Sequence, residues 1–160
     1  MKQKWAKSER FERVERFDVA GTPEQVFPLL CPVREYDWLP GWSCTMYCSS
    51  SGVAEKDAVF MTREGFCQQA TWTTITYEPS RFIEYLVVSG RHAVVRLSIS
   101  LEGKGNGSTE LTWRMRFTST SGLGGQILRR RFSTEGFGTM LRSRKAELDA
   151  WLSTGRMIGR

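Results

Sequence analysis

The chain has 160 residues, a length typical of one domain, and 40% of them are hydrophobic. Its formal net charge is +6, but no nucleic-acid-binding motif accompanies the basic residues, so we expect a solvated basic surface and no nucleic-acid partner. No stretch approaches the ~20 apolar residues of a membrane-spanning helix, which excludes stable membrane insertion. The N-terminus has no secretory signal and the four cysteines form no CxxC pair, so a cytoplasmic protein with reduced thiols is expected.

The chain begins with a polar extension, residues 1–10, followed by a strand from Phe11 to Ala20 with a bulge predicted near Arg16. A short helix is predicted next. Thr22 can cap it, Pro23 suits its first position, and Gln25 follows Thr22 by three residues, as in a capping box.

The connector at residues 31–42 is Pro-rich and combines three large aromatic side chains with two acids. Loops of this kind often carry function. One interpretation is a second short helix, Val33 to Trp38, with Trp38 filling one end of the core. The other is a loop that contributes Trp42 to a pocket. The sequence leaves both open.

Period-two alternation of apolar and polar residues then predicts a series of strands. The turns between them are short, and residues 103–107 form a glycine-rich hairpin turn, which favours an antiparallel sheet of sequential neighbours. The alternating segments are residues 44–49, 58–64, 69–77, 82–88, 94–101 and 111–118.

The last long segment, Gln126 to Leu152, is predicted to be a helix that follows a small-residue loop at 119–125. Gly136 and Gly138 interrupt it, and Arg144 falls inside its apolar arc. One apolar sheet face and one amphipathic helix predict an α+β fold. The apolar stripe of the helix consists of Phe137, Met140, Leu141, Leu148, Trp151 and Leu152.

Four motifs stand in a fixed order along the predicted elements: residues 20–27, Trp38 with Pro40–Trp42, residues 77–83, and Leu111–Trp113. Together with the order of elements, they resemble the START and Bet v 1-like superfamily of polyketide cyclase/dehydrase and lipid transport domains, also called SRPBCC, in an uncharacterised bacterial branch. The resemblance covers about Phe11 to Trp151. It implies a helix-grip fold, in which a seven-stranded antiparallel sheet wraps round a long C-terminal helix, with two short helices after the first strand. The domain would span residues 11–153, with a tail at 154–160.

The resemblance also implies an apolar cavity that binds a hydrophobic small molecule such as a lipid or polyketide. Arg144 could bind an anionic group of the ligand, with Glu64 or Glu84 as partners, or could pair with Glu147 or extend from the rim. The strand phases and the helix stripe together predict a lining of Trp42, Phe60, Trp72, Tyr85, Leu97, Trp113, Met115, Phe137, Met140, Leu141 and Arg144.

Catalytic signatures are missing from the sequence. The single histidine, His92, and the scattered cysteines give no zinc-ligand spacing, no nucleophile pair is evident, and no nucleotide motif is present, so no metal or cofactor is expected. We therefore expect a binding protein rather than an enzyme. Two alternatives remain open: a polyketide-type cyclase or dehydratase in the same cavity, and an interaction domain whose aromatic side chains fill that space. A homodimer is also left open.

Overall fold

The structure, a computed structural model, describes residues 8–64 and 68–159. The strands are β1 (Arg10–Ala20), β2 (Cys44–Cys48), β3 (Val59–Glu64), β4 (Gln68–Glu78), β5 (Phe82–Ser89), β6 (Ala93–Gly103) and β7 (Ser108–Ser119). The helices are α1 (Pro23–Val26), the 3-10 helix η1 (Phe27–Leu30), α2 (Glu35–Trp38), α3 (Gly122–Arg131) and α4 (Thr134–Thr154).

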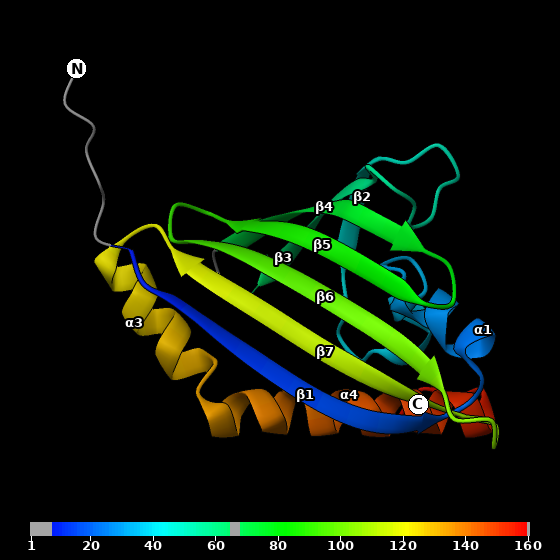
Figure 1. Cartoon of the computed structure of the whole chain (residues 1–160). Helices are drawn as coiled ribbons and strands as arrows, with labels where there is room; N and C mark the ends of the chain where they lie inside the picture. The colour runs from blue at the N-terminus through cyan, green and yellow to red at the C-terminus, as the bar shows by residue number, and fades with distance from the viewer. Residues whose placement is uncertain (1–7, 65–67, 160) are drawn as a thin grey trace.

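The seven strands form one antiparallel sheet in the order β1-β7-β6-β5-β4-β3-β2 (Figure 1). The predicted meander is therefore confirmed, with the first strand closing the sheet against the last. β1 pairs with β7 in unbroken register, from Arg10 opposite Thr118 to Ala20 opposite Ser108. The predicted bulge near Arg16 is wrong, because one phase of alternation runs along the whole of β1. Register shifts occur in β2 and β4 instead.

The predicted C-terminal helix is two helices. α3 begins at Gly122, so part of the predicted loop is helical, and Ser121 caps it by accepting a hydrogen bond from the Gly124 amide at 3.0 Å. The helical conformation ends at Phe132, the C-cap of α3, and Ser133 then caps the start of α4. α4 then runs alongside β1 to Thr154 (Figure 1). The long helix packing on the sheet confirms the helix-grip architecture.

Close neighbours explain why glycine occupies two positions near the start of α4. A Cβ at Gly136 would lie 3.0 Å from the carbonyl oxygen of Arg131, so a larger residue would crowd the junction with α3. A Cβ at Gly138 would lie 3.3 Å from the Arg142 guanidinium and 3.4 Å from the carboxylate of Glu15 on β1. Both glycines therefore allow close packing.

The short helices after β1 close one end of the core. The Thr22 amide donates to Gln25 Oε1 at 2.9 Å, as the capping-box pattern predicts. Trp38, at the end of α2, is completely buried, and its indole Nε1 donates to the Leu29 carbonyl at 2.8 Å. The interpretation of Trp38 as a core residue is therefore confirmed.

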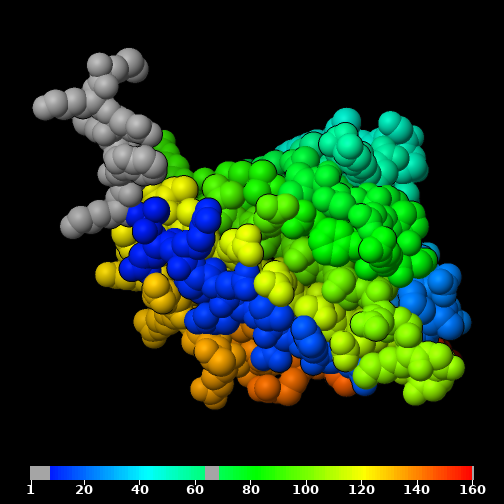
Figure 2. Space-filling model, viewed as in Figure 1, coloured from blue at the N-terminus to red at the C-terminus, as the bar shows by residue number. Residues whose placement is uncertain are grey.

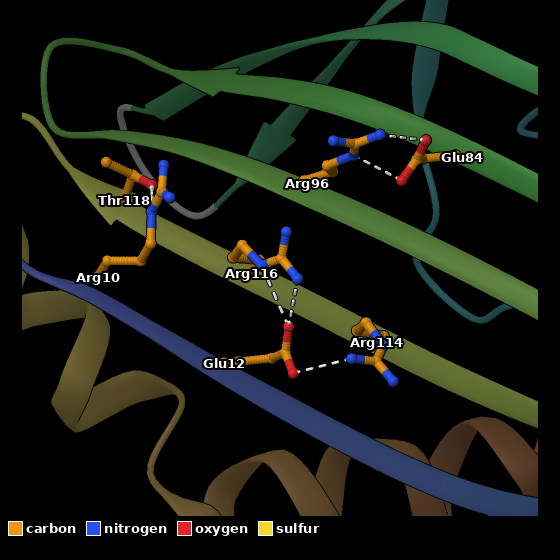
Figure 3. A network of polar contacts seen from close by, with 7 residues as sticks. All are labelled: Arg10, Glu12, Glu84, Arg96, Arg114, Arg116 and Thr118. Carbon is orange, nitrogen blue, oxygen red and sulfur yellow. Dashed lines mark hydrogen bonds and ion pairs between the residues drawn. The ribbon is translucent and has the colours of Figure 1, made fainter.

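The outer face of the sheet carries ion pairs. Figure 2 shows this face, on which β1, β7, β6 and β5 lie side by side. Glu12 accepts hydrogen bonds from Arg114 and Arg116, each at 2.9 Å, and Arg96 binds Glu84 at 2.6 Å (Figure 3). Glu84 is thus committed to Arg96 on the outside, so its suggested pairing with Arg144 is wrong.

Candidate functional site

A cavity of about 70 Å³ lies between the sheet, the short helices and α4. Its wall brings together segments from both halves of the chain, as the helix-grip arrangement requires. Most of the wall is carbon, with a few polar groups. The lining residues are Leu30, Pro32, Glu35, Trp42, Phe60, Trp72, Tyr85, Leu97, Ile99, Trp113 and Arg144.

The floor of the cavity comes from the central strands. Tyr85 on β5 is paired with Leu97 on β6, and Ile99 on β6 is paired with Trp113 on β7. Alternate residues of paired strands point to the same side of a sheet, so these four side chains share its inner face. All four are buried, with exposed fractions of 7% or less.

An aromatic group forms the side towards β3 and β4. Phe60 and Trp72 stack with ring centroids 5.5 Å apart, and Tyr85 meets each of them edge-on at 5.8 Å. The polar atoms of Trp72 and Tyr85 form hydrogen bonds within the protein. Trp72 Nε1 donates to Thr62 Oγ1 at 2.9 Å, and Tyr85 Oη donates to the Leu30 carbonyl at 3.1 Å.

Two tryptophans in the wall differ in how their indole nitrogens are satisfied. Trp42 Nε1 donates to the Pro32 carbonyl at 2.7 Å, which fixes the ring at the edge of the cavity. Trp113 Nε1 is buried and has no hydrogen-bond partner among the described residues. A buried donor without an acceptor is destabilising by about 1–3 kcal/mol. The cavity wall therefore contains an unsatisfied donor.

Four residues of the wall were not predicted from the sequence: Leu30, Pro32, Glu35 and Ile99. Glu35, in the first turn of α2, is the one among them with an ionisable side chain. Burial raises the pKa of its carboxyl from 4.5 to about 8, and the positive charge of Arg144 offsets this only in part. No hydrogen bond to this carboxyl occurs in the part of the chain that the structure describes. At neutral pH most of the molecules therefore hold Glu35 as an uncharged acid beside the cavity.

Arg144 lines the cavity and also contacts its own helix. Its Nη1 lies 3.5 Å from Glu147 Oε2, a long ion pair between half-buried side chains. Glu35 attracts it electrostatically, but within the described residues the two form no ion pair. The side chain of Glu64, the other suggested partner, lies outside the described residues. The two interpretations of Arg144, as a cavity residue and as a partner of Glu147, therefore coexist.

Two further groups near Glu35 stay uncharged at neutral pH. Burial, with a smaller contribution from the Glu35 carboxylate, raises the pKa of Tyr85 well above its usual value. Burial also raises the pKa of the Cys44 thiol on β2. Glu35 is consequently the acid in this group whose titration falls closest to neutral pH.

Four of the predicted lining residues lie outside the wall of this cavity. Met115, Phe137 and Leu141 are buried in the hydrophobic core, and Met140 packs against that core while partly exposed. The stripe on α4 correctly identifies the face that turns inward. It does not identify which part of that face lines the cavity and which part packs against other side chains in the core.

Among the described residues, no group of three or more histidine, cysteine or acidic side chains is placed to hold a metal ion. Cys31, Cys44 and Cys48 are free thiols, and Cys67 lies outside the described residues. No helix in the described ranges is long and apolar enough to cross a membrane.

Comparison with known proteins gives one family and several similar folds. The Mll3558 protein from Rhizobium loti superposes with a TM-score of 0.67 at 14% identity, over 89% of this chain and all of that one. Norcoclaurine synthase from Thalictrum flavum gives 0.67 at 11% identity, over 92% of this chain and 88% of that one. A Rhodobacter sphaeroides protein gives 0.61 at 21% identity, over 89% and 92%.

These similarities support the fold alone, because sequence identities of 11–21% are too low to transfer an activity. A search of curated proteins gave no match. The sequence profile described as "Polyketide cyclase / dehydrase and lipid transport" matches residues 10–150, nearly the whole domain. The chain therefore belongs to the polyketide cyclase/dehydrase and lipid transport family.

Proposed function

We propose that this protein binds a hydrophobic small molecule, such as a lipid or polyketide, in the cavity between the sheet and α4. The observation that carries the proposal is the cavity wall. Leu30, Leu97 and Ile99 contribute aliphatic surface, and stacked aromatic rings complete the side towards β3 and β4. Ligand sites are typically apolar concavities with a few polar groups that orient the ligand. Membership of a family that includes lipid transport supports the same conclusion.

The volume of the cavity sets a condition on the ligand. About 70 Å³ is smaller than the roughly 300–1,000 Å³ of pockets that enclose drug-sized molecules. A lipid or polyketide therefore needs wall residues to move. Glu35, Trp42, Trp72 and Arg144 are partly exposed members of the wall that have room to move, whereas Leu97 and Trp113 are buried. The ligand would enter along the partly exposed side.

Filling the cavity tests this proposal. Leu97→Trp adds bulk inside the cavity and is expected to weaken binding of the uncharged fluorescent probe N-phenyl-1-naphthylamine at least about tenfold, since the added ring occupies the ligand's space. Leu86→Trp is the matched control, because Leu86 is exposed on the adjacent strand β5. Fluorescence titration of both folded variants gives the comparison. Equal affinity of the Leu97→Trp variant and the wild type would contradict the proposal.

A second candidate is an acid–base reaction in the same cavity, as in a polyketide-type cyclase or dehydratase. The observation in its favour is Glu35, whose carboxyl has a pKa of about 8 beside an apolar cavity. Ionised Glu35 could take a proton from a carbon next to a ligand carbonyl and return one from solvent. Arg144 and Tyr85 would supply the convergent polar groups that such a site requires.

This second candidate predicts exchange of the hydrogens beside a carbonyl. In heavy water, cyclopentanone is expected to lose its α-proton signals in the ¹H NMR spectrum faster with the wild-type protein than with Glu35→Gln. Proton transfer by a positioned side chain typically contributes about 10²–10⁴-fold. Equal rates for the two proteins would remove Glu35 as a catalytic residue and leave binding as the function.

A further inference from the structure

The Glu35 carboxyl is one of two polar groups of the cavity wall that have no hydrogen-bond partner among the described residues, and Trp113 Nε1 is the other. Three other polar groups of the wall have partners: Trp42 and Tyr85 donate to backbone carbonyls, and Trp72 donates to Thr62. Arg144 has its contact with Glu147. The Glu35 carboxyl has none among the described residues, and it is not one of the polar groups that are sealed off from solvent. A molecule entering the cavity can therefore reach it.

The charge state of this carboxyl limits what it can bind. Burial makes the ionised form costly, and the protonated form has one O–H donor with nothing to accept it. The charged or titratable groups that face Glu35 from other elements are Arg144 on α4, Tyr85 on β5 and Cys44 on β2. Arg144 already contacts Glu147, which reduces the positive charge available to an anionic ligand.

We propose that Glu35 is the polar anchor of the cavity, and that it selects uncharged ligands carrying a carbonyl or hydroxyl oxygen at the end that enters first. The ligand oxygen accepts a hydrogen bond from the protonated carboxyl while the remainder of the ligand packs on the apolar wall. This inference rests on the proposed function, because it assigns ligand chemistry to the same cavity. The unsatisfied Nε1 of Trp113 in the same wall is a second polar group that the protein alone leaves without a partner.

Three small cyclic probes of similar size test the anchor: cyclopentane, cyclopentanone and cyclobutanecarboxylate. Their affinities are measured by NMR titration of the wild-type protein near pH 6. Cyclopentanone is expected to bind about tenfold more tightly than cyclopentane, which a single satisfied hydrogen bond can provide. Cyclobutanecarboxylate is expected to bind more weakly than cyclopentanone. Tighter binding of the carboxylate would overturn the proposal and assign the site to Arg144.

Two substitutions isolate the role of the O–H donor. Glu35→Leu keeps a similar volume and is expected to bind both neutral rings with equal affinity. Glu35→Gln keeps a donor that does not titrate. The preference of the wild type for cyclopentanone is expected to decline above about pH 8, as Glu35 ionises, whereas that of Glu35→Gln persists. Unchanged preference in Glu35→Leu would overturn the anchor.

The outcomes distinguish a failure of the Glu35 anchor from a failure of ligand binding in the cavity. If cyclopentane and cyclopentanone bind the wild type equally, the anchor is wrong while ligand binding in the cavity stands. If neither ring binds and N-phenyl-1-naphthylamine also fails to bind, both the anchor and the proposed function are overturned.

Discussion

Replacing Glu35 by glutamine is expected to make the protein more stable at high pH and to leave its stability near pH 4.5 almost unchanged. The folded state keeps this carboxyl protonated up to about pH 8, whereas the unfolded chain releases the proton near its ordinary pKa of 4.5. Between these values the unfolded state binds fewer protons, so the contribution of Glu35 to stability falls as the pH rises and is fully lost above about pH 8.

The size of the effect follows from the two pKa values. Their separation corresponds to at most ~5 kcal/mol. Glu35 is partly exposed, so solvent reduces this, and we expect a gain of about 2–4 kcal/mol for Glu35→Gln above pH 8. Urea unfolding of both proteins at several pH values measures the difference in the free energy of unfolding.

Glu24→Gln is the matched control for this measurement. Glu24 and Glu35 both lie in the first turn of a four-residue helix, but Glu24 is exposed and lines no part of the cavity. The control is expected to stay within about 0.5 kcal/mol of the wild type across the range. A Glu35→Gln curve that runs parallel to the wild-type curve would show that the Glu35 carboxyl has an ordinary pKa.

Truncation of Trp38 to alanine is expected to be the most destabilising single change in the connector, by about 3–5 kcal/mol. The substitution removes a completely buried ring and leaves the Leu29 carbonyl without its donor. Trp38→Phe keeps most of the volume and loses only the hydrogen bond, so about 1–3 kcal/mol is expected, and this variant should remain folded. Chemical denaturation measures both losses.

Trp42→Ala provides the comparison from the same connector. Trp42 also donates its indole N–H to a backbone carbonyl, but its ring is partly exposed at the cavity. Its truncation is expected to cost less stability than that of Trp38 and to change ligand affinity more. The reverse order of the two stability losses would mean that the short helices do not close the core as described.

The sheet could be predicted from the sequence because burial on one face imposes strict alternation. Leu97, Trp113 and Tyr85 lie on the inner face of long strands whose apolar positions repeat every second residue. A slip of one residue would turn the whole set outward, so the pattern fixes their side. The position of these residues in the cavity wall follows from that constraint.

The contribution of Glu35 could not be predicted in the same way. A helix of four residues is too short for the spacing of its apolar residues to show which side faces inward. An acidic residue in a Pro-rich connector is ordinarily expected to be exposed to solvent and charged. Its place in the wall depends on how α2 docks near Arg144, which is a tertiary contact. The break between α3 and α4 had one weak sign in the sequence. Ser133 is a residue type that often caps helices, and its side chain accepts a hydrogen bond from the Gly136 amide at the start of α4.

The residues of α4 show a different limit. Periodicity identifies Phe137 and Leu141 as inward-facing, and they are buried. Whether an inward side chain meets a cavity or a close-packed neighbour depends on the volumes of side chains distant in the sequence. Gly138, which lies close to Glu15 on β1, shows how tightly this part of α4 packs.

A hydrophobic ligand is expected to bind in the cavity between the sheet and α4. Intermolecular nuclear Overhauser effects between protonated cyclopentanone and methyl-labelled protein test it most directly. Effects are expected at the methyl groups of Leu30, Leu97 and Ile99, which line the cavity, and none at Leu148, which is buried in the core and is not part of the cavity wall. Effects confined to exposed methyl groups such as those of Leu86 and Leu123, or no effects at all, would contradict it.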